Sequence, residues 1–228
     1  MGSHRRPKFS KTIMAFVLIW LGLSLTACID LAGTQSLAKN KNYVFNSRAQ
    51  VYVMRGGLGG IFSTGMNQLQ KTLERDYKIK TESTTWFKAY SLADYIVKHY
   101  GSKGLSGPIV LVGHSLGANE QIKVARILAK AHIPVAILIT VDAVSPLEVS
   151  PNVKYVLNIY KPSFVPMFSG LRVRAIDPTR TQVENLNVDT IKEVGVNHFT
   201  IDKHEVIQKI MIEKILAAIA ANSGKRSR

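Results

Sequence analysis

The feature that most constrains the fold is a repeated alternation of short apolar runs with amphipathic segments. Continuous apolar runs stand at 107–114 (GPIVLVGH), 134–144 (PVAILITVDAV) and 152–160 (NVKYVLNIY). Such runs are typical of parallel strands that are buried on both faces. Segments 116–132 and 202–221 carry apolar residues at helical spacing. Strands and helices that alternate in this way predict an α/β domain, with a mainly parallel sheet and helices on both faces.

The same alternation begins earlier in the chain. A short strand pattern at 50–54 is followed by helical spacing at 65–76, a second strand pattern at 78–84 and a second helical pattern at 91–100. The chain has 228 residues and is 46% hydrophobic, which fits a single domain. We place this domain at 49–222 and a basic tail at 223–228. A flavodoxin-like or Rossmann sheet fits the same periodicity, so function has to be argued from sites.

The first residues differ in kind from the rest of the chain. Four basic residues and no acidic one precede an unbroken apolar run at 13–25, which is followed by the sequence LTAC at 25–28. This three-part order is typical of a secretory signal. The run of thirteen residues would rise only about 20 Å as a helix, against a hydrocarbon core of about 30 Å. The sequence therefore predicts export rather than a permanent membrane span.

The sequence LTAC resembles the lipobox of bacterial lipoproteins. The resemblance implies a signal peptide at 1–27, cleavage before Cys28 and a lipid on Cys28. Residues 31–48 are polar and small with no helical period, so we place the lipidated cysteine and its tether at 28–48. Ile29 rather than an aspartate follows Cys28, which by the same resemblance implies the periplasmic face of a Gram-negative outer membrane. Cys28 is the only cysteine, so it cannot form an internal disulfide. An uncleaved anchor, or a plain signal peptide cut near Ala27, remains the alternative.

The chain is strongly basic, with 30 Lys and Arg against 15 Asp and Glu and a formal net charge of +15. Cleavage of the leader would remove four of these positive charges. The others are scattered, which is typical of a solvated surface and, in an exported lipoprotein, also favours anionic lipid headgroups. No recognisable nucleic-acid-binding motif is present, and aromatic residues are not interleaved with the basic clusters. We therefore do not expect a nucleic-acid partner.

A G-x-S-x-G motif, GHSLG, occupies 113–117, directly between a predicted strand and a predicted helix. A nucleophilic serine on a sharp strand-to-helix turn needs small neighbours, because the turn strains the backbone and brings those neighbours close together. Gly113, Gly117 and Ala118 meet that need. The alternative is an ordinary Gly-Ser turn without catalytic function.

At these residues the chain resembles the α/β-hydrolase family, in particular its lipase, esterase and thioesterase-like branches. The resemblance covers roughly 50–221. It implies that Ser115 is the nucleophile, that the N–H of Leu116 is one donor of the oxyanion hole, and that His114 is a turn residue. Only the sequence SPLEVSP, at 145–151, separates the strand before Asp142 from the next predicted strand, so we expect a small α/β-hydrolase fold without a large cap domain. Such a site needs no cofactor, and the sequence contains no recognisable metal-binding motif.

The glycine-rich segment RGGLGG at 55–60 follows the first predicted strand. By the resemblance, Gly56, Gly57 and Leu58 take the place of the family's His-Gly-x segment, and Arg55 stands where the histidine often is. We expect the N–H of Gly57 or Leu58 to be the second oxyanion donor. A plain glycine turn, or a loop that cradles phosphate, is the alternative, although the spacing does not match the G-x-G-x-x-G fingerprint.

The family's chain order of Ser, acid and His restricts the choice of base. Of the six histidines, only His132, His198 and His204 follow Ser115. His132 precedes every acid that could orient it, and His204 falls in the expected first turn of the last helix, where the helix dipole disfavours an imidazolium. His198 lies in the loop before that helix, which is the family's position for the catalytic histidine. We predict that His198 is the general base.

The orienting acid is predicted from its place at the sheet edge. Asp142 ends a predicted strand on the same edge as Ser115, where a carboxylate could fix the tautomer of His198. Asp177 is the first alternative acid, followed by Asp189, Glu148 and Glu184. A buried aspartate that only caps a turn through Ser145 is the structural alternative for Asp142.

These predictions together favour a serine hydrolase that cleaves a carboxylic ester. Its substrate would be an acyl ester or lipid-like molecule, and its membrane contact would be the lipid on Cys28. The segment 162–196 is the candidate acyl wall or small lid, because it contains the apolar residues Phe164, Val165, Met167 and Phe168. A thioesterase or acyltransferase would use the same triad. A non-catalytic envelope lipoprotein that keeps the fold as a binding module is the rival of a different class.

Overall fold

The computed structural model describes residues 43–102, 105–145, 147–165 and 168–223. The expected signal peptide, Cys28, most of the expected tether, Met167 and nearly all of the basic tail lie outside these residues. Among the described helices, none has the length and apolar character needed to cross a membrane.

Six strands of the described chain form one sheet in the order β2-β1-β3-β4-β6-β8, and each neighbouring pair is parallel. Their bounds are Gln50–Arg55 (β1), Thr81–Thr85 (β2), Ile109–His114 (β3), Ile137–Val141 (β4), Tyr155–Tyr160 (β6) and Gln182–Asn187 (β8). Short parallel strands β5 (Glu148–Val149) and β7 (Arg174–Ala175) form a separate pair. The expected parallel sheet is confirmed.

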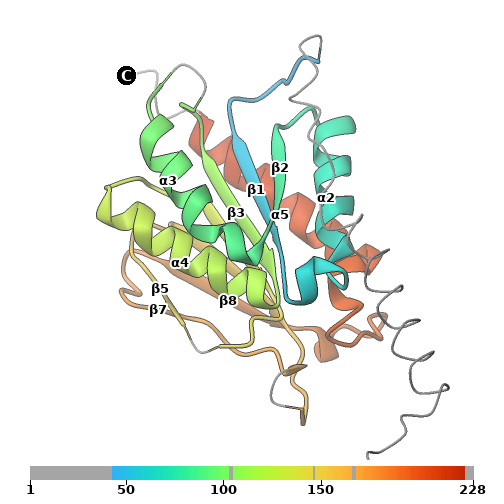
Figure 1. The fold of residues 1–228 in the computed structure, drawn as a ribbon. Coiled ribbons are helices and arrows are strands. Elements are labelled where there is room, and N and C mark those ends of the chain that lie inside the picture. Colours follow the sequence, from blue (N-terminus) through green and yellow to red (C-terminus); the bar gives the residue numbers. More distant parts are fainter. Residues whose placement is uncertain (1–42, 103–104, 146, 166–167, 224–228) are drawn as a thin grey trace, which may run out of the picture. The chain divides into compact units, whose positions relative to one another are not determined.

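Helices cover both faces of this sheet, with α3 and α4 on one side and α2 and α5 on the other (Figure 1). Side chains of β1 alternate between the two faces: Val51 and Val53 pack toward α2 and α5, whereas Tyr52 and Met54 pack toward α3 and α4. The helices are Thr64–Arg75 (α2), Ala89–His99 (α3), Leu116–Lys130 (α4) and Glu205–Ser223 (α5). Two apolar cores, one on each face, therefore explain why the central strands are apolar throughout.

The order of the strands reverses between β1 and β3. From β1 the chain first adds β2 on one side, and then returns to add β3, β4, β6 and β8 on the other side. In open parallel sheets, such a switch point leaves a crevice at the carboxyl ends of the strands, where ligands bind. The loop after β1, with its short 3-10 helix η2 (Leu58–Gly60), and the turn after β3 both lie at that crevice.

The segment 162–196 does not form only a wall or lid. It contains β7, the 3-10 helix η5 (Val188–Thr190) and β8, which is the edge strand of the main sheet. The sequence of β8, QVENLN, is polar because none of its residues is fully buried. A half-exposed edge strand therefore lacks the continuous apolar pattern that marks the central strands.

The sequence before the last helix has the local pattern of an N-cap with a capping box, because Asp202 is followed three residues later by Glu205. The structure uses Asp202 differently. Asp202 lies in the 3-10 helix η6 (Ile201–Lys203), and α5 begins at Glu205. The buried carboxylate of Asp202 instead accepts the N–H of Gly65, with Oδ2 2.9 Å from the nitrogen, in the first turn of α2. A Cβ on Gly65 would lie 2.0 Å from the Asp202 carbonyl oxygen. Asp202 thus caps a different helix, 137 residues away in sequence.

Candidate active site

Ser115 lies at the sharp turn between β3 and α4, at the switch point of the sheet. Its backbone angles, φ 58° and ψ −128°, are strained for a residue other than glycine. Small neighbours permit the turn. A Cβ on Gly113 would lie 2.4 Å from the carbonyl oxygen of Gly117, and a Cβ on Gly117 would lie 2.4 Å from that of Met54. The turn presents the Ser115 hydroxyl at the carboxyl edge of the sheet.

A continuous chain of hydrogen bonds links three of the residues predicted from the sequence. Nδ1 of His198 lies 2.7 Å from Oδ2 of Asp142, and Nε2 of His198 lies 2.9 Å from Oγ of Ser115. Because a carboxylate only accepts, His198 donates from Nδ1, and Nε2 is left to accept the proton of the Ser115 hydroxyl. Asp142 is fully buried, and His198 is 6% exposed. The three side chains converge as a nucleophile, a base and an orienting acid would, and those roles remain predictions.

The position of the Asp142 carboxylate is fixed by the backbone around it. Asp142 has a positive φ of 52°, and its N–H donates to the carbonyl oxygen of Ile159. Oδ1, the oxygen that does not face His198, accepts the N–H of Lys161 at 2.8 Å. Gly170 packs against the same oxygen so closely that a Cβ there would lie 1.9 Å from it. The carboxylate is therefore held through both of its oxygens.

The structure does not bring the alternative acids to His198. Asp177 lies on a surface turn, where its carboxylate accepts hydrogen bonds from the side chain and the backbone of Thr179. These bonds lower the pKa of Asp177. The other three acids are also engaged or exposed elsewhere: Asp189 contacts Lys161, Glu184 contacts Lys214 and Tyr155, and Glu148 is exposed.

Two backbone segments adjoin the Ser115 hydroxyl at the positions expected for an oxyanion hole. The loop after β1 passes so close that a Cβ on Gly56 would lie 2.8 Å from Cβ of Ser115. The N–H of Gly56 itself is not available, because it donates to Oγ of Ser63 at 3.0 Å. Three N–H groups have no acceptor among the described residues, namely those of Gly57, Leu58 and Leu116. These are the donors expected from the sequence, and their function remains a prediction.

The Ser115 hydroxyl borders a cavity of about 540 Å³ that is lined mainly by apolar side chains. Phe199 joins two other aromatic rings of the lining, with ring centroids 5.0 Å from Phe62 and 4.9 Å from Phe168. Phe168 also packs against the His198 ring at 5.4 Å. Leu58, Leu116 and Val144 complete the apolar lining. Of the expected acyl wall, Phe168 lines the cavity, whereas Phe164 is fully exposed. Phe62 and Phe199 were not expected.

His114 is more than a turn residue. It is the last residue of β3, and it is only 1% exposed. Nδ1 lies 2.8 Å from Oγ of Ser63, and Nε2 lies 2.9 Å from the carbonyl oxygen of His198. Burial, and to a lesser degree the nearby His198, lowers the pKa of His114 to about 3. His114 is therefore neutral near pH 7.

Asp202 lies near the His114 ring and is completely buried. Its Oδ2 atom is 4.0 Å from Nδ1 of His114, beyond hydrogen-bond distance, and Oδ1 has no partner among the described residues. Burial raises the pKa of Asp202 to about 7. No sequence pattern indicates this contact, because Asp202 and His114 are distant along the chain.

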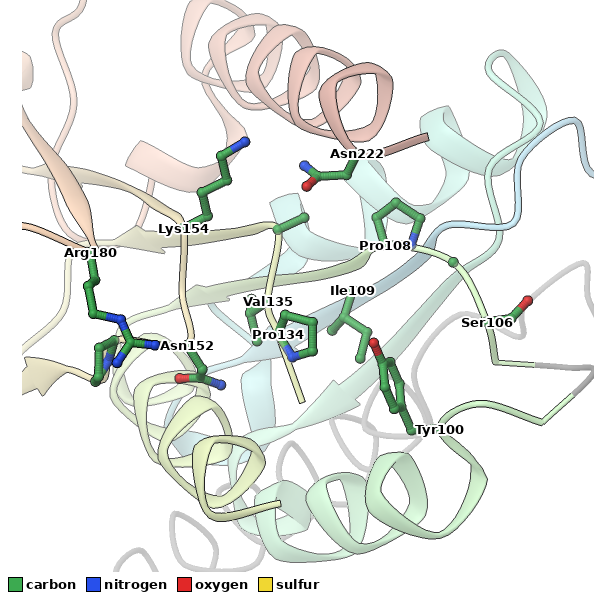
Figure 2. Close-up of a pocket in the computed structure, with 13 residues that line it drawn as sticks. Tyr100, Ser106, Pro108, Ile109, Pro134, Val135, Asn152, Lys154, Arg180 and Asn222 are labelled. Carbon is green, nitrogen blue, oxygen red and sulfur yellow. The ribbon is translucent and has the colours of Figure 1, made fainter. Parts of the chain in front are cut away.

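A second cavity, of about 460 Å³, lies at the opposite, amino edge of the sheet (Figure 2). Its lining includes three prolines, Pro108, Pro134 and Pro151. Figure 2 shows the side chains of Lys154 and Arg180 extending in different directions, so they do not meet at one point. This cavity lacks the convergent polar groups that surround Ser115.

Comparison with known proteins finds likeness in structure and none in sequence. No protein-family model matches the chain, and no curated protein matches it. Among solved structures, it is similar to the NocB thioesterase domain from the nocardicin cluster, with 13% identity, 82% of this chain and 99% of that chain covered, and a TM-score of 0.49. An esterase from Pyrobaculum calidifontis is 13% identical to this chain, and the match covers 95% of this chain and 96% of the esterase, with a TM-score of 0.47. RedJ thioesterase from Streptomyces coelicolor is 11% identical to this chain, and the match covers 74% of this chain and 90% of RedJ, with a TM-score of 0.42.

The fold class follows from the chain's own topology. The parallel sheet with helices on both faces, and the strained strand-to-helix turn at Ser115, are those of an α/β-hydrolase fold. The described residues between β4 and β6 contain only β5. The described residues therefore form a small α/β-hydrolase fold, and they contain no large cap domain.

Replacement of Asp202 by Asn should change how stability depends on pH. The folded-state pKa of about 7 lies above the ordinary value of 3.8, so between these values the folded state binds more protons than the unfolded state. The free energy of unfolding of the wild type therefore falls as the pH rises through this range. In Asp202→Asn the free energy of unfolding does not decrease for this reason, because asparagine does not ionise. The side-chain oxygen of the asparagine can still accept the N–H of Gly65.

We expect the free energy of unfolding of Asp202→Asn, relative to the wild type, to rise by up to roughly 4 kcal/mol between about pH 4 and about pH 8. Urea unfolding of both proteins at the two pH values measures this difference. All other titrating groups are shared, so their contributions cancel in the comparison. A difference that stays constant with pH would contradict the raised pKa.

Proposed function

We propose that this protein is a serine hydrolase that cleaves carboxylic esters. Ser115 is the nucleophile, His198 is the general base, and Asp142 orients His198. The observation that carries the proposal is the hydrogen-bond chain from Asp142 through His198 to Ser115. A serine hydroxyl is a weak nucleophile until a neighbouring base accepts its proton. A buried carboxylate fixes the tautomer of that base and stabilises the imidazolium that forms.

In the first half of the reaction, Oγ of Ser115 attacks the carbonyl carbon of the ester while its proton passes to Nε2 of His198. The carbonyl oxygen becomes an oxyanion, which accepts hydrogen bonds from the N–H of Leu116 and from that of Gly57 or Leu58. The intermediate collapses as the bond to the alkoxy oxygen breaks. His198 gives its proton to the leaving alcohol, and the acyl group remains on Ser115.

In the second half, His198 takes a proton from a water molecule, and the resulting hydroxide attacks the acyl carbon. The same N–H groups stabilise the second oxyanion. When this intermediate collapses, the bond to Oγ of Ser115 breaks and the proton on His198 returns to that oxygen. The carboxylic acid leaves, and the enzyme is restored.

The cavity supports an acyl ester or lipid-like molecule as the substrate. Its lining is apolar apart from the residues around Ser115, and Phe62, Phe168 and Phe199 form one contiguous wall. Such a wall removes acyl carbon atoms from water, which contributes about 0.8 kcal/mol for each buried methylene. Thioesters can react by the same steps, so competition between water, thiols and alcohols for the acyl-enzyme distinguishes an esterase from a thioesterase or an acyltransferase.

Replacement of Ser115 by Ala should abolish hydrolysis, because the acyl-enzyme forms on the hydroxyl that this change removes. We expect turnover of p-nitrophenyl esters to fall by about 10⁴-fold or more, and labelling by a fluorophosphonate to be lost. Ser145→Ala is the matched control, since Ser145 lines the same cavity without a bond to His198. Labelling of Ser115→Ala at the wild-type level would exclude the proposal.

Replacement of Asp142 by Asn should separate the two candidate acids. The new side-chain amide would present an N–H₂ group to Nδ1 of His198, so the ring would carry its proton on Nε2 and could not accept from Ser115. We expect kcat to fall by about 100-fold or more. Asp177→Asn, at the surface turn, should retain wild-type kcat. A large loss in Asp177→Asn together with an active Asp142→Asn would reverse the assignment.

We infer from the lipobox-like sequence that the chain is exported, cleaved before Cys28 and anchored by a lipid on Cys28. The site would then act at the periplasmic face of the outer membrane. The full chain, expressed in a Gram-negative host with an alkyne-labelled fatty acid, should incorporate label and enter the outer-membrane fraction. Cys28→Ser should lose the label, whereas Ser115→Ala should retain it. Absence of label from the wild type would exclude lipidation.

A further inference from the structure

A buried line of hydrogen bonds connects two loops that the proposed reaction would need. The N–H of Gly56, in the loop after β1, donates to Oγ of Ser63 at 3.0 Å. Ser63 Oγ lies 2.8 Å from Nδ1 of His114, and Nε2 of His114 lies 2.9 Å from the carbonyl oxygen of His198. Ser63 is 2% exposed and His114 is 1% exposed. We call the side chains of Ser63 and His114 the loop bridge.

The direction of each hydrogen bond in the loop bridge is determined by its ends. The carbonyl oxygen of His198 can only accept, so His114 donates from Nε2. In a neutral ring, Nδ1 must then accept, and Ser63 is its donor. The N–H of Gly56 can only donate, and Ser63 accepts it. The low pKa of His114, which burial brings to about 3, agrees with a neutral ring. Both side chains are thus fully paired in one arrangement.

The pairing excludes a second nucleophile–base pair. Ser63 and His114 have the spacing of such a pair, but the far nitrogen of His114 is bound to a carbonyl oxygen instead of a carboxylate. The carboxylate of Asp202 is 4.0 Å from the near nitrogen and is directed to Gly65. The far side of the ring therefore lacks, among the described residues, the carboxylate that would stabilise an imidazolium.

We propose that the loop bridge is a positioning device, which sets the distance between the oxyanion donors and the general base. One end holds Gly56 and therefore places the N–H groups that follow it. The other end holds the backbone of His198, whose ring contacts Ser115. A displacement of about 1 Å in such a geometry can reduce a rate by about 100-fold. The inference rests on the proposed function, since it assigns roles toward the same reaction.

Replacement of His114 by Phe removes both ring hydrogen bonds but keeps an aromatic ring of similar shape. We expect kcat for a p-nitrophenyl ester to fall about 10- to 100-fold, while KM changes less than about twofold, because all the apolar side chains that line the cavity are kept. His99→Phe, on the exposed surface of α3, is the matched control and should behave as the wild type. Far-UV circular dichroism and thermal unfolding establish that each variant is folded.

Two milder variants test the loop bridge if His114→Phe does not fold. His114→Gln places an amide N–H₂ near the former Nε2 position and can keep the bond to His198, so it should lose less kcat than His114→Phe. Ser63→Ala frees the N–H of Gly56 and should lower kcat without changing KM. Ser63 and His114 act through one line of hydrogen bonds. The double variant that combines Ser63→Ala with His114→Gln should therefore have a kcat no lower than that of the slower of these two single variants.

The inference is overturned if folded His114→Phe keeps kcat within about twofold of the wild type. It is also overturned if the losses in Ser63→Ala and His114→Gln multiply fully in the double variant, since independent sites are additive in free energy. Imidazole nitrogen NMR of the wild type gives a readout without activity: His114 should be neutral, with its proton on Nε2, from about pH 5 to pH 8.

The NMR result separates this inference from the proposed function. A wild type that neither hydrolyses esters nor reacts with a fluorophosphonate would remove the function, even with the expected His114 tautomer. If NMR instead shows that His114 is charged, or that its neutral ring carries the proton on Nδ1 and none on Nε2, the loop bridge is excluded even if the enzyme is active.

Discussion

The close contact between β1, β3 and the start of α4 is the constraint on which the rest of this site depends. Gly117 approaches the backbone of Met54, and Gly113 approaches Gly117, at distances that leave no space for a Cβ. These contacts hold Ser115 at a positive φ, a strain of roughly 1–3 kcal/mol. The strain persists because α4 packs along the sheet with a continuous apolar face. The Ser115 hydroxyl is therefore positioned by packing interactions that do not involve it.

Buried polar groups extend that constraint to the surrounding loops. A buried hydrogen-bonding group without a partner costs about 1–3 kcal/mol, so each member of a buried network restricts where its neighbours can lie. Asp142 holds the ring of His198, and the Ser63–His114 pair holds Gly56 and the His198 carbonyl. Asp202 then ties α2 to the segment after His198. Loops of little regular structure acquire fixed positions through these contacts.

The central sheet was predictable because strands buried on both faces leave a continuous apolar pattern. Asp142 was predictable for a related reason: it follows such a strand, so the sheet itself places it at the edge beside Ser115. β8 escaped prediction because a half-exposed edge strand permits polar residues. Asp202 was misassigned because an acid before an apolar helical pattern satisfies the local capping rule, whereas the folded chain uses it for α2. Local patterns cannot reveal partners 51 or 137 residues apart.

The position of His198 shows how two strand ends can fix one loop residue. β4 ends at Val141, and Asp142 just beyond it binds the imidazole; β3 ends at His114, which binds the carbonyl of the same residue. Two attachment points, one on the side chain and one on the backbone, restrict rotation of His198 as well as its translation. Phe168 and Phe199 pack against the ring from the cavity side. Because β3 also ends in the turn that carries Ser115, one strand sets both the position of Ser115 and that of the His198 backbone.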